Sequence, residues 1–453
     1  MPDSISDGLP PARRYFALLA VVIAIWAVML DAMAVSVALP ILARDFGTEA
    51  ADVTWVVGVS QLVTVSLLLV LSSVGEMVGY RRVHQTGLLI FVAATLACAV
   101  APSLSLLVAA RAVQAAGAAC VLSLNFAMVR HIFPSDRLGW AVGLVATAVA
   151  VASSLGPSAA GVILSVADWR WIFAMTVPLG LASLLLGNVV LPQAPGSGQR
   201  LDVPSAILSA STFGGLLLAL TGAGHGWPPA AIAGLGILGL AAGTTLVLRL
   251  RHADAPLLPL DLFRLPVFAL SITASIAAFA AQMLAYVVLP FLFLGGLGLS
   301  ELETGIAFSL WPLALAFAAP MAGRLADRLP SGPMGFTGML VMASGLLLLA
   351  ILPTDAGILD ISWRMALCGI GLGIFQATNN RTMLGAAPRH RSGAASGMVA
   401  TARHMGQAIA IALAAFALAW SPTSGPALAL ALATGFALVS ATISITRRRL
   451  AKG

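Results

Sequence analysis

Asp31 lies in the middle of an apolar stretch that runs from Ala24 to Pro40. An ionised carboxylate inside the hydrocarbon of a membrane costs at least about 2.5 kcal/mol on insertion scales, so an acid in such a stretch indicates a function. Of the 17 acidic residues of the chain, Asp31 is the one that the pattern places well inside an apolar span. The chemistry open to such a carboxylate is the binding and release of a proton.

Arg111 offers Asp31 a partner of opposite charge. With a rise of 1.5 Å per residue, Asp31 lies about 13 Å below the outer end of its helix, and Arg111 about 10 Å below the same surface. The similar depths predict an ion pair. One interpretation is a proton switch, in which a modest rearrangement loads or releases a proton. The alternative is a permanent pair that only clamps two helices together.

Uncharged polar residues inside the apolar stretches predict a polar interior. Gln114 follows Arg111 by three residues and therefore shares its helix face, and other groups repeat at spacings of three or four. The predicted lining of a substrate cavity is Gln61, Thr64, Gln114, Gln282, Tyr286, Gln376, Asn379 and Asn380. The alternative for each residue is an interhelical hydrogen bond, which stabilises a bundle by about 0.6 kcal/mol.

Membrane-spanning helices are the elements that must position these residues. The chain has 453 residues, of which 60% are hydrophobic and 9% charged, and its mean hydropathy is +1.00. A soluble domain carries about 25% charged residues. Alternating stretches of about ten residues, the pattern of a membrane β-barrel, are absent. The composition predicts an all-α polytopic membrane protein.

Apolar runs of about 20 residues, the length that crosses a bilayer, occur fourteen times. The predicted helices are 15–42, 53–74, 83–101, 104–129, 138–165, 171–191, 203–222, 228–249, 266–293, 304–323, 334–352, 363–383, 394–419 and 425–446. When these helices alternate in direction, eighteen of the 24 lysines and arginines fall on the side of the N-terminus and three fall on the other. This asymmetry predicts that both termini are cytoplasmic. The net charge of +7 is therefore explained by the basic residues in cytoplasmic loops that orient the helices, and nucleic acid is not a predicted partner.

A short charged turn is repeated, once as Gly75 to Arg82 and once as Gly323 to Arg328. The repeat predicts two related six-helix bundles, as in many secondary transporters. The predicted parts are a tail at 1–14, bundles at 15–191 and 265–446, a linker at 192–264 with two inserted helices, and a basic tail at 447–453. The turns are interpreted as a cytoplasmic gate or, alternatively, as topology-setting charge. The gate residues are Glu76, Gly79, Arg81, Arg82, Gly323, Asp327 and Arg328.

Gly156, Pro157 and Gly161 lie toward the outer end of the fifth predicted helix. Proline removes a helical hydrogen bond and kinks the helix, and small residues let another backbone approach closely. One interpretation is a hinge or a tight helix pair that controls opening, and the alternative is ordinary small-residue packing.

Signals of an enzyme or a cofactor site are missing from the sequence. The six histidines are scattered without metal-ligand spacing, and no phosphate-binding loop is present. The three cysteines lie in apolar spans without paired spacing. We therefore expect no enzyme, no metal and no cofactor, and a transport process driven by an ion gradient or by the gradient of the substrate.

Four ordered motifs resemble the fourteen-helix drug:proton antiporters of the major facilitator superfamily. They are LDAMAVSVALP at 30–40, LVAARAVQAAG at 107–117, Gly156-Pro157 with Gly161, and WRWIF at 169–173 followed by VPLG at 177–180. The first gate turn departs from the family pattern, because Ser72 replaces its first glycine and Glu76-Met77 its Asp-Arg pair. The second turn keeps Asp-Arg but lacks the later Gly-Arg-Arg, and Gln61 stands where an aromatic residue is usual.

The resemblance implies the major facilitator fold and alternating access in the plasma (inner) membrane. Inward movement of protons would drive lipophilic, often cationic, drugs out of the cell. Asp31 would carry the proton and Arg111 would modulate it, and the protein would act as a monomer in the bilayer. The alternatives are export of one physiological solute, such as a lipid, amino acid or siderophore, and a membrane receptor or scaffold without transport. The predicted ion pair and the repeated turn speak against the last.

Overall fold

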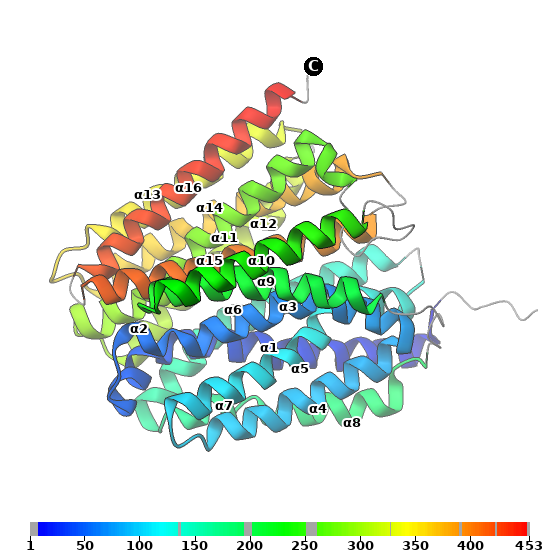
Figure 1. Ribbon diagram of the computed structural model, residues 1–453, viewed down its shortest axis with the longest axis horizontal. Coiled ribbons are helices and arrows are strands. Elements are labelled where there is room, and N and C mark those ends of the chain that lie inside the picture. Colours follow the sequence, from blue (N-terminus) through cyan, green and yellow to red (C-terminus); the bar gives the residue numbers. More distant parts are fainter. Residues whose placement is uncertain are drawn as a thin grey trace, which may run out of the picture.

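A computed structural model describes residues 8–134, 137–193, 202–250, 261–326, 328–388, 392–421 and 424–450. The described residues form helices and connecting segments without strands. Fourteen helices are long and apolar enough to cross a membrane (Figure 1). The predicted fold class and number of spans are therefore confirmed. Much of the two polar linkers, at 194–201 and 251–260, lies outside the described residues.

The spans are numbered along the chain as in Figure 1. The first six are α1 (Pro11–Phe46), α2 with α3 (Ala50–Val53, Trp55–Val78), α4 (Tyr80–Ala99), α5 (Leu104–Ile132), α6 (Leu138–Val166) and α7 with α8 (Arg170–Ala174, Val177–Val190). The next two are α9 (Val203–Gly224) and α10 (Pro229–Leu250). The last six are α11 (Pro266–Pro290) with the π-helical turn η2 (Phe291–Gly296), α12 (Glu301–Leu325), α13 (Ser331–Ala350), α14 (Ile358–Ala386), α15 (Ser392–Trp420) and α16 (Gly425–Leu450). The 3₁₀ turn η1 (Leu262–Arg264) precedes α11.

Several helices extend beyond the apolar runs that predict them. Pro11 begins α1, where its missing N–H is harmless, and Gly47 ends it with a left-handed φ of 61°. At the other end of the chain, α16 continues to Leu450. Arg447, which the sequence places in a cytoplasmic tail, therefore lies inside a helix and is 2% exposed. Hydropathy locates the membrane boundary, whereas caps and packing decide where a helix ends.

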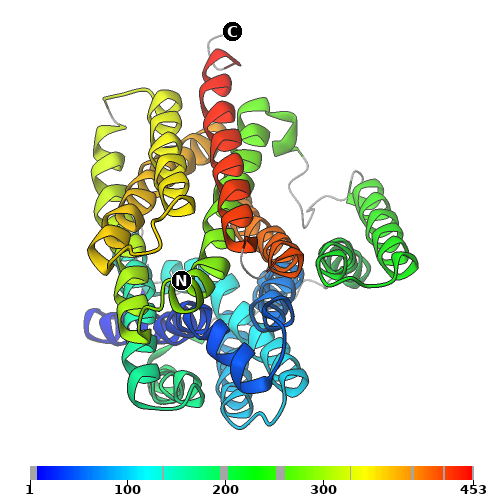
Figure 2. The ribbon, with the colours of Figure 1, turned by 90° about the vertical axis from the view of Figure 1, so that its left-hand side faces the viewer.

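The helices form two groups with different apolar cores. We name α1 to α8 the first bundle and α11 to α16 the second bundle. The terminal end of the molecule is where α1 begins and α16 ends, and the distal end is opposite. The bundles meet where α6 packs against α12 and where α3 packs against α15. Figure 2 shows the molecule from another side, with the first bundle in blue to teal and the second in light green to red.

At the distal end, buried residues of both bundles form one continuous core. Its members include Leu39 of α1, Val56 of α3, Phe308 of α12 and Ala414 of α15. At the terminal end the cores are separate. One is built on α1 and α5 of the first bundle, and another on α11, α14 and α15 of the second. The molecule is therefore closed between the bundles at its distal end.

The inserted helices form a pair at the side of the molecule (Figure 2). Of the two, α9 packs against both α3 and α15, whereas α10 packs mainly against α9. At the distal end, His225 contacts the Ala51 carbonyl at 3.0 Å. At the terminal end, Arg249 pairs with Asp202 at 2.9 Å. Hydrogen bonds from Ser205 and Arg249 hold the pKa of Asp202 below its usual value. The pair therefore covers one seam between the bundles.

Candidate functional site

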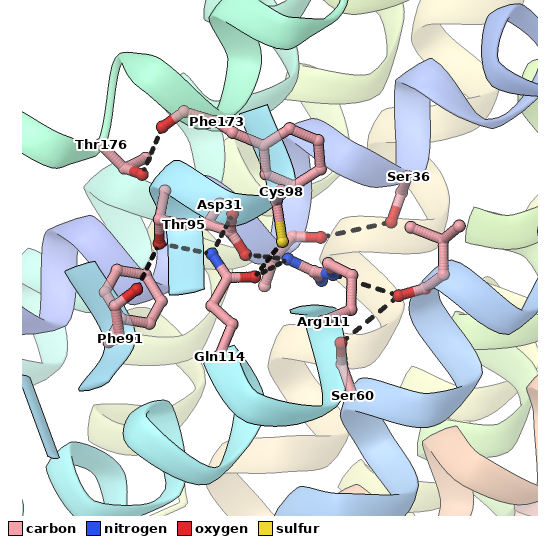
Figure 3. A network of polar contacts seen from close by, with 12 residues as sticks. Asp31, Ser36, Ser60, Phe91, Thr95, Cys98, Arg111, Gln114, Phe173 and Thr176 are labelled. Carbon is pink, nitrogen blue, oxygen red and sulfur yellow. Dashed lines mark hydrogen bonds and ion pairs between the residues drawn. The ribbon is translucent and has the colours of Figure 1, made fainter. Parts of the chain in front are cut away.

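The carboxylate of Asp31 is enclosed by the first bundle (Figure 3). Asp31 lies on α1 and is 4% exposed, and Arg111 on α5 is 3% exposed. The Nη1 atom of Arg111 lies 2.5 Å from Oδ2 of Asp31. The ion pair expected from the two depths is therefore present. Whether it switches during a reaction or only clamps α1 to α5 is a separate question.

Gln114 completes the enclosure of Asp31. Its Nε2 donates to Oδ1 of Asp31 at 3.0 Å and to Oγ1 of Thr95 at 2.7 Å. Its Oε1 accepts a hydrogen bond from Nη1 of Arg111 at 2.5 Å. The Sγ atom of Cys98 lies 3.8 Å from the same Oε1 atom. Both oxygens of the Asp31 carboxylate are thus engaged by donors, and one amide connects α1, α4 and α5.

The guanidinium of Arg111 is held on two further sides. Its Nε donates to the carbonyl of Val56 on α3 at 3.1 Å, and its Cζ lies 5.7 Å from the ring centroid of Phe173 on α7. A cation over an aromatic face gains electrostatic attraction when water is excluded. A buried pair repays its desolvation only when such additional contacts satisfy it, and removal of one partner leaves a buried charge uncompensated. In this arrangement, a proton on Asp31 would weaken its contacts with Arg111 and Gln114 at the same time.

The turn of α1 that carries Asp31 packs against Gly156 of α6. A Cβ atom at Gly156 would lie 2.8 Å from Cβ of Met33 and 3.2 Å from the Leu30 carbonyl. One turn further along, a Cβ atom at Gly161 would lie 2.7 Å from the Glu301 carbonyl of α12. Pro157 lies between these two contacts. The small residues of α6 therefore connect the Asp31 turn to the second bundle at the distal end.

The predicted cavity residues do not converge on one place. Oε1 of Gln61 on α3 accepts a hydrogen bond across the seam from Nδ1 of His404 on α15 at 2.9 Å, and Thr64 is buried one turn away. Gln282, Gln376 and Asn380 are half-buried on α11 and α14. In the described part of the chain, no hydrogen bond joins Gln376 or Asn380 to another residue.

Asn379 and Tyr286 are buried against neighbouring helices, which agrees with the alternative of interhelical contact. Asn379 is fully buried, and its Nδ2 donates to Oγ of Ser275 at 2.7 Å while its Oδ1 accepts from Arg447. It joins α14 to α11 and α16 and does not line a cavity. Tyr286 is 2% exposed because its ring packs against Phe308 and Trp311, with centroids 5.7 and 5.1 Å away. Helical spacing identifies a shared face but not the neighbour that covers it.

The predicted gate residues are not paired with one another among the described residues. Glu76, Arg82 and Arg328 are exposed at the terminal end, and Asp327 lies outside the described residues. Arg81 donates to the Asn188 carbonyl at 2.5 Å and so joins α4 to α8. Gly79 has a φ of 107°, which explains the need for glycine at this turn. A Cβ atom at Gly323 would meet no atom within 4 Å.

The structure adds site residues that the sequence did not single out. Thr95, Cys98 and Phe173 are ordinary residues of apolar helices, and the Val56 carbonyl carries no sequence signal. Their part in the Asp31 site arises only when α3, α4 and α7 pack around α5. Arg403 and His404 of α15 could have been singled out from the sequence, because charged or titratable residues inside a predicted span are uncommon and often functional.

Comparison with known proteins gives this arrangement a context. A family profile described as Major Facilitator Superfamily matches residues 21–411. The chain is 42% identical over 446 residues to an uncharacterized transporter of Escherichia coli, YebQ, with 98% of each chain covered. It is 27% identical to the riboflavin transporter RibZ of Clostridioides difficile, covering 88% of this chain and 87% of that protein. It is 28% identical to the multidrug efflux pump LfrA of Mycolicibacterium smegmatis, covering 89% and 80%.

A solved structure has a similar arrangement of helices. The chain superposes on a mutant of the peptide transporter POT in complex with sulfate with a TM-score of 0.74, covering 95% of this chain and 94% of that chain. The sequence identity is 14%, so this similarity concerns the fold alone.

Proposed function

We propose that this chain, which belongs to the major facilitator superfamily, exports lipophilic small molecules in exchange for protons. It is a multi-pass membrane transporter rather than an enzyme. Asp31 is the proton carrier in this proposal, and Arg111 and Gln114 modulate it. The proton gradient is the energy source, and no cofactor takes part. The protein acts as a monomer in the plasma (inner) membrane, with both termini in the cytoplasm.

The observation that carries the proposal is the enclosure of Asp31 by Arg111 and Gln114. A proton on Asp31 neutralises the carboxylate, which weakens the attraction of Arg111 for Oδ2 and leaves its guanidinium to the Val56 carbonyl and Gln114. Because water is excluded from the pair, the attraction lost on neutralising the carboxylate is stronger than it would be in water. The Asp31 turn contacts α6 at Gly156, so the change has a short route to the seam with α12.

The separate cores of the two bundles support alternating access. The bundles share one core at the distal end and have separate cores at the terminal end. With cytoplasmic termini, this is a state closed to the outside. The gate residues that the structure describes are not paired with one another at the terminal end, and this agrees with such a state because a latch of opposite charges forms only when that end closes.

Lipophilic drugs are the substrate class that the efflux pump LfrA suggests by similarity. The expectation of cationic drugs depends on a carboxylate that is free to meet a cation. Both Asp31 oxygens are instead occupied in this state, so the proposal does not include positive charge. Export of one physiological solute is the second candidate, and the riboflavin transporter RibZ among the relatives favours it.

The test uses inverted membrane vesicles whose respiration-driven proton gradient is followed with an acridine dye. In wild-type vesicles, we expect riboflavin or naphthalene-2-sulfonate to collapse the gradient partly. Asp31→Asn is expected to abolish the response because an amide cannot carry the proton. Asp52→Asn, at an exposed acid of α2, is the control and should respond as the wild type does. An undiminished response of Asp31→Asn would refute the proton carrier, and a response to riboflavin alone would favour the second candidate.

A further inference from the structure

The charges inside the described spans are unevenly distributed between the bundles. Asp31 is the only acidic residue of the described spans that lies away from a helix end, and it is bonded to Arg111 and Gln114. In the second bundle, Arg403 lies eleven residues after Ser392, the first residue of α15. At 1.5 Å per residue this is about 16 Å into the helix, near the middle of a bilayer.

Arg403 has no partner among the described residues. No hydrogen bond, ion pair or cation–π contact joins its side chain to them, whereas Arg111, Arg364 and Arg447 are each bonded. A guanidinium in a span that has neither an acid nor carbonyl groups around it is costly, and such residues mark the pathways of substrates and ions. Its half-buried side chain leaves it accessible to a ligand.

The periodicity of α15 indicates where Arg403 faces. Arg403, Gln407, Ala410 and Ala414 follow at spacings of four, three and four, which places them on one face. Ala410 and Ala414 are fully buried in the distal core that both bundles share. Arg403 and Gln407 continue this face toward the terminal end, where the cores of the bundles are separate. They therefore face the first bundle at the level where the shared core stops.

Two polar atoms beside Arg403 are also buried and lack a hydrogen bond of good geometry to the described residues, although the His404 and Gln407 side chains interact with each other. They are Nε2 of His404 and Oε1 of Gln407, and His404 is 7% exposed. The Nδ1 atom of His404 is engaged by Gln61 across the seam at 2.9 Å. Buried polar atoms are nearly always well hydrogen-bonded in folded proteins, so these two acceptors retain capacity for the donors of a ligand.

We infer that Arg403, His404 and Gln407 on α15, with Gln61 opposite, form the substrate-binding site of this transporter, and that the site takes a lipophilic organic anion such as an aromatic carboxylate or sulfonate. Arg403 supplies the fork of N–H donors that fits such an anion in a bidentate manner. His404 and Gln407 accept hydrogen bonds from hydroxyl or amide groups of the same molecule. The inference rests on the proposed function and specifies its substrate class.

The site separates the substrate from the proton. Arg403 belongs to the second bundle and Asp31 to the first, so the two ligands do not compete for one carboxylate. Coupling must then pass through the relative positions of the bundles, for which the Gln61–His404 contact and the α6–α12 packing provide the connections. Binding of the anion and protonation of Asp31 are thus separable by mutation.

The experiment compares ligands that differ in charge but share an aromatic ring. Naphthalene-2-sulfonate, 2-naphthoate and 2-naphthyltrimethylammonium are titrated into the purified full-length protein by calorimetry. We expect the sulfonate and the carboxylate to bind and the ammonium to bind at least about tenfold more weakly. Stronger binding of the ammonium, or no binding of either anion at millimolar concentration, would overturn the inference.

The variants identify the residue responsible. Arg403→Gln should weaken anion binding at least about tenfold, since a charge-assisted contact is lost. Arg403→Lys should retain the preference for anions with lower affinity. Arg44→Gln, at an exposed arginine at the distal end of α1, is the matched control and should bind as the wild type does. The thermal midpoint of Arg403→Gln should stay equal or rise, because the variant removes a half-buried charge that has no partner among the described residues, and this excludes misfolding. Unchanged anion affinity in a folded Arg403→Gln variant would refute the assignment.

Asp31→Asn distinguishes this inference from the proposed function. If both are correct, Asp31→Asn binds 2-naphthoate as the wild type does but loses proton-coupled transport. If Asp31→Asn keeps transport while Arg403→Gln loses binding, the proton carrier is wrong and the anion site stands. If Asp31→Asn loses transport while Arg403→Gln keeps wild-type binding, the anion site is wrong and the proton carrier stands.

Discussion

At the scale of single residues, Gln114 has a larger part in the Asp31 site than its neutral side chain suggests. It is 1% exposed, donates to the carboxylate and to Thr95, and accepts from the guanidinium. An amide is suited to this position because it offers donors on one side and an acceptor on the other. A charged residue there would pair with one partner and repel the other.

We expect Gln114→Leu to lower both stability and proton coupling. Hydrogen bonds to charged groups contribute about 1.5–3 kcal/mol each, and leucine leaves Asp31 and Arg111 without a shared partner. The measurement is the thermal midpoint in detergent together with dye-monitored proton release in vesicles. Gln376→Leu is the control, since Gln376 is half-buried and unbonded among the described residues. Equal midpoints for the two variants would contradict the role given to Gln114.

At the scale of helices, α6 connects the bundles through glycine contacts. Gly161 of α6 and Gly305 of α12 face each other, and Ser158 and Ser309 are hydrogen-bonded at 2.6 Å beside them. A Cβ atom at Gly305 would lie 2.5 Å from the Pro157 carbonyl. Because the obstructing atoms belong to backbone, they cannot move aside by a change of rotamer. This crossing holds the distal end closed.

Gly161→Ala is therefore expected to loosen the distal end and to increase proton leakage through the protein. Its Cβ would lie 2.7 Å from the Glu301 carbonyl, and overpacking of this kind costs about 1–3 kcal/mol. Proteoliposomes with an imposed pH gradient measure the leakage. In the control Gly143→Ala on the same helix, the new Cβ meets no atom within 4 Å and should be neutral or stabilising by up to about 1 kcal/mol. Leakage at the wild-type level in Gly161→Ala would show that the crossing does not control opening.

At the scale of the whole molecule, the two bundles are closed against each other at one end only. A transporter that alternates must exchange this arrangement for one with a shared core at the terminal end. The α9–α10 pair covers the seam of α3 and α15, and α9 contacts both bundles. When one bundle moves against the other, α9 must therefore either slide over α3 or α15 or move with one of them.

Spin labels measure this exchange. One pair, at Val78 and Leu325, reports on the terminal end, and another, at Val166 and Leu359, reports on the distal end. All four residues are exposed, whereas the native cysteines are buried and should remain unlabelled. On acidification we expect the terminal distance to shorten and the distal distance to lengthen in part of the population, and Asp31→Asn to abolish this response to pH. Changes of the same sign at both ends would contradict alternating access.

The sequence by itself determined the membrane class, the fourteen spans, the family and the pairing of Asp31 with Arg111. These follow from hydropathy, from charge placement and from depth along a helix. All three depend only on position in the chain or on depth along the membrane normal. For Asn379 and Tyr286 the sequence left cavity lining and interhelical contact open, since spacing gives the face of a helix but not the helix that covers it.

The tertiary structure decided what surrounds each residue in the membrane plane. It placed Gln114, Thr95 and the Val56 carbonyl around the ion pair and bonded Arg447 to Asn379. It left Arg403 without a partner among the residues that it describes. It also decided that the bundles are closed at the distal end. The physical reason is that all fourteen helices satisfy the same requirement of apolar length, so their lateral neighbours are selected by the fit of small residues and polar contacts between segments far apart in the chain.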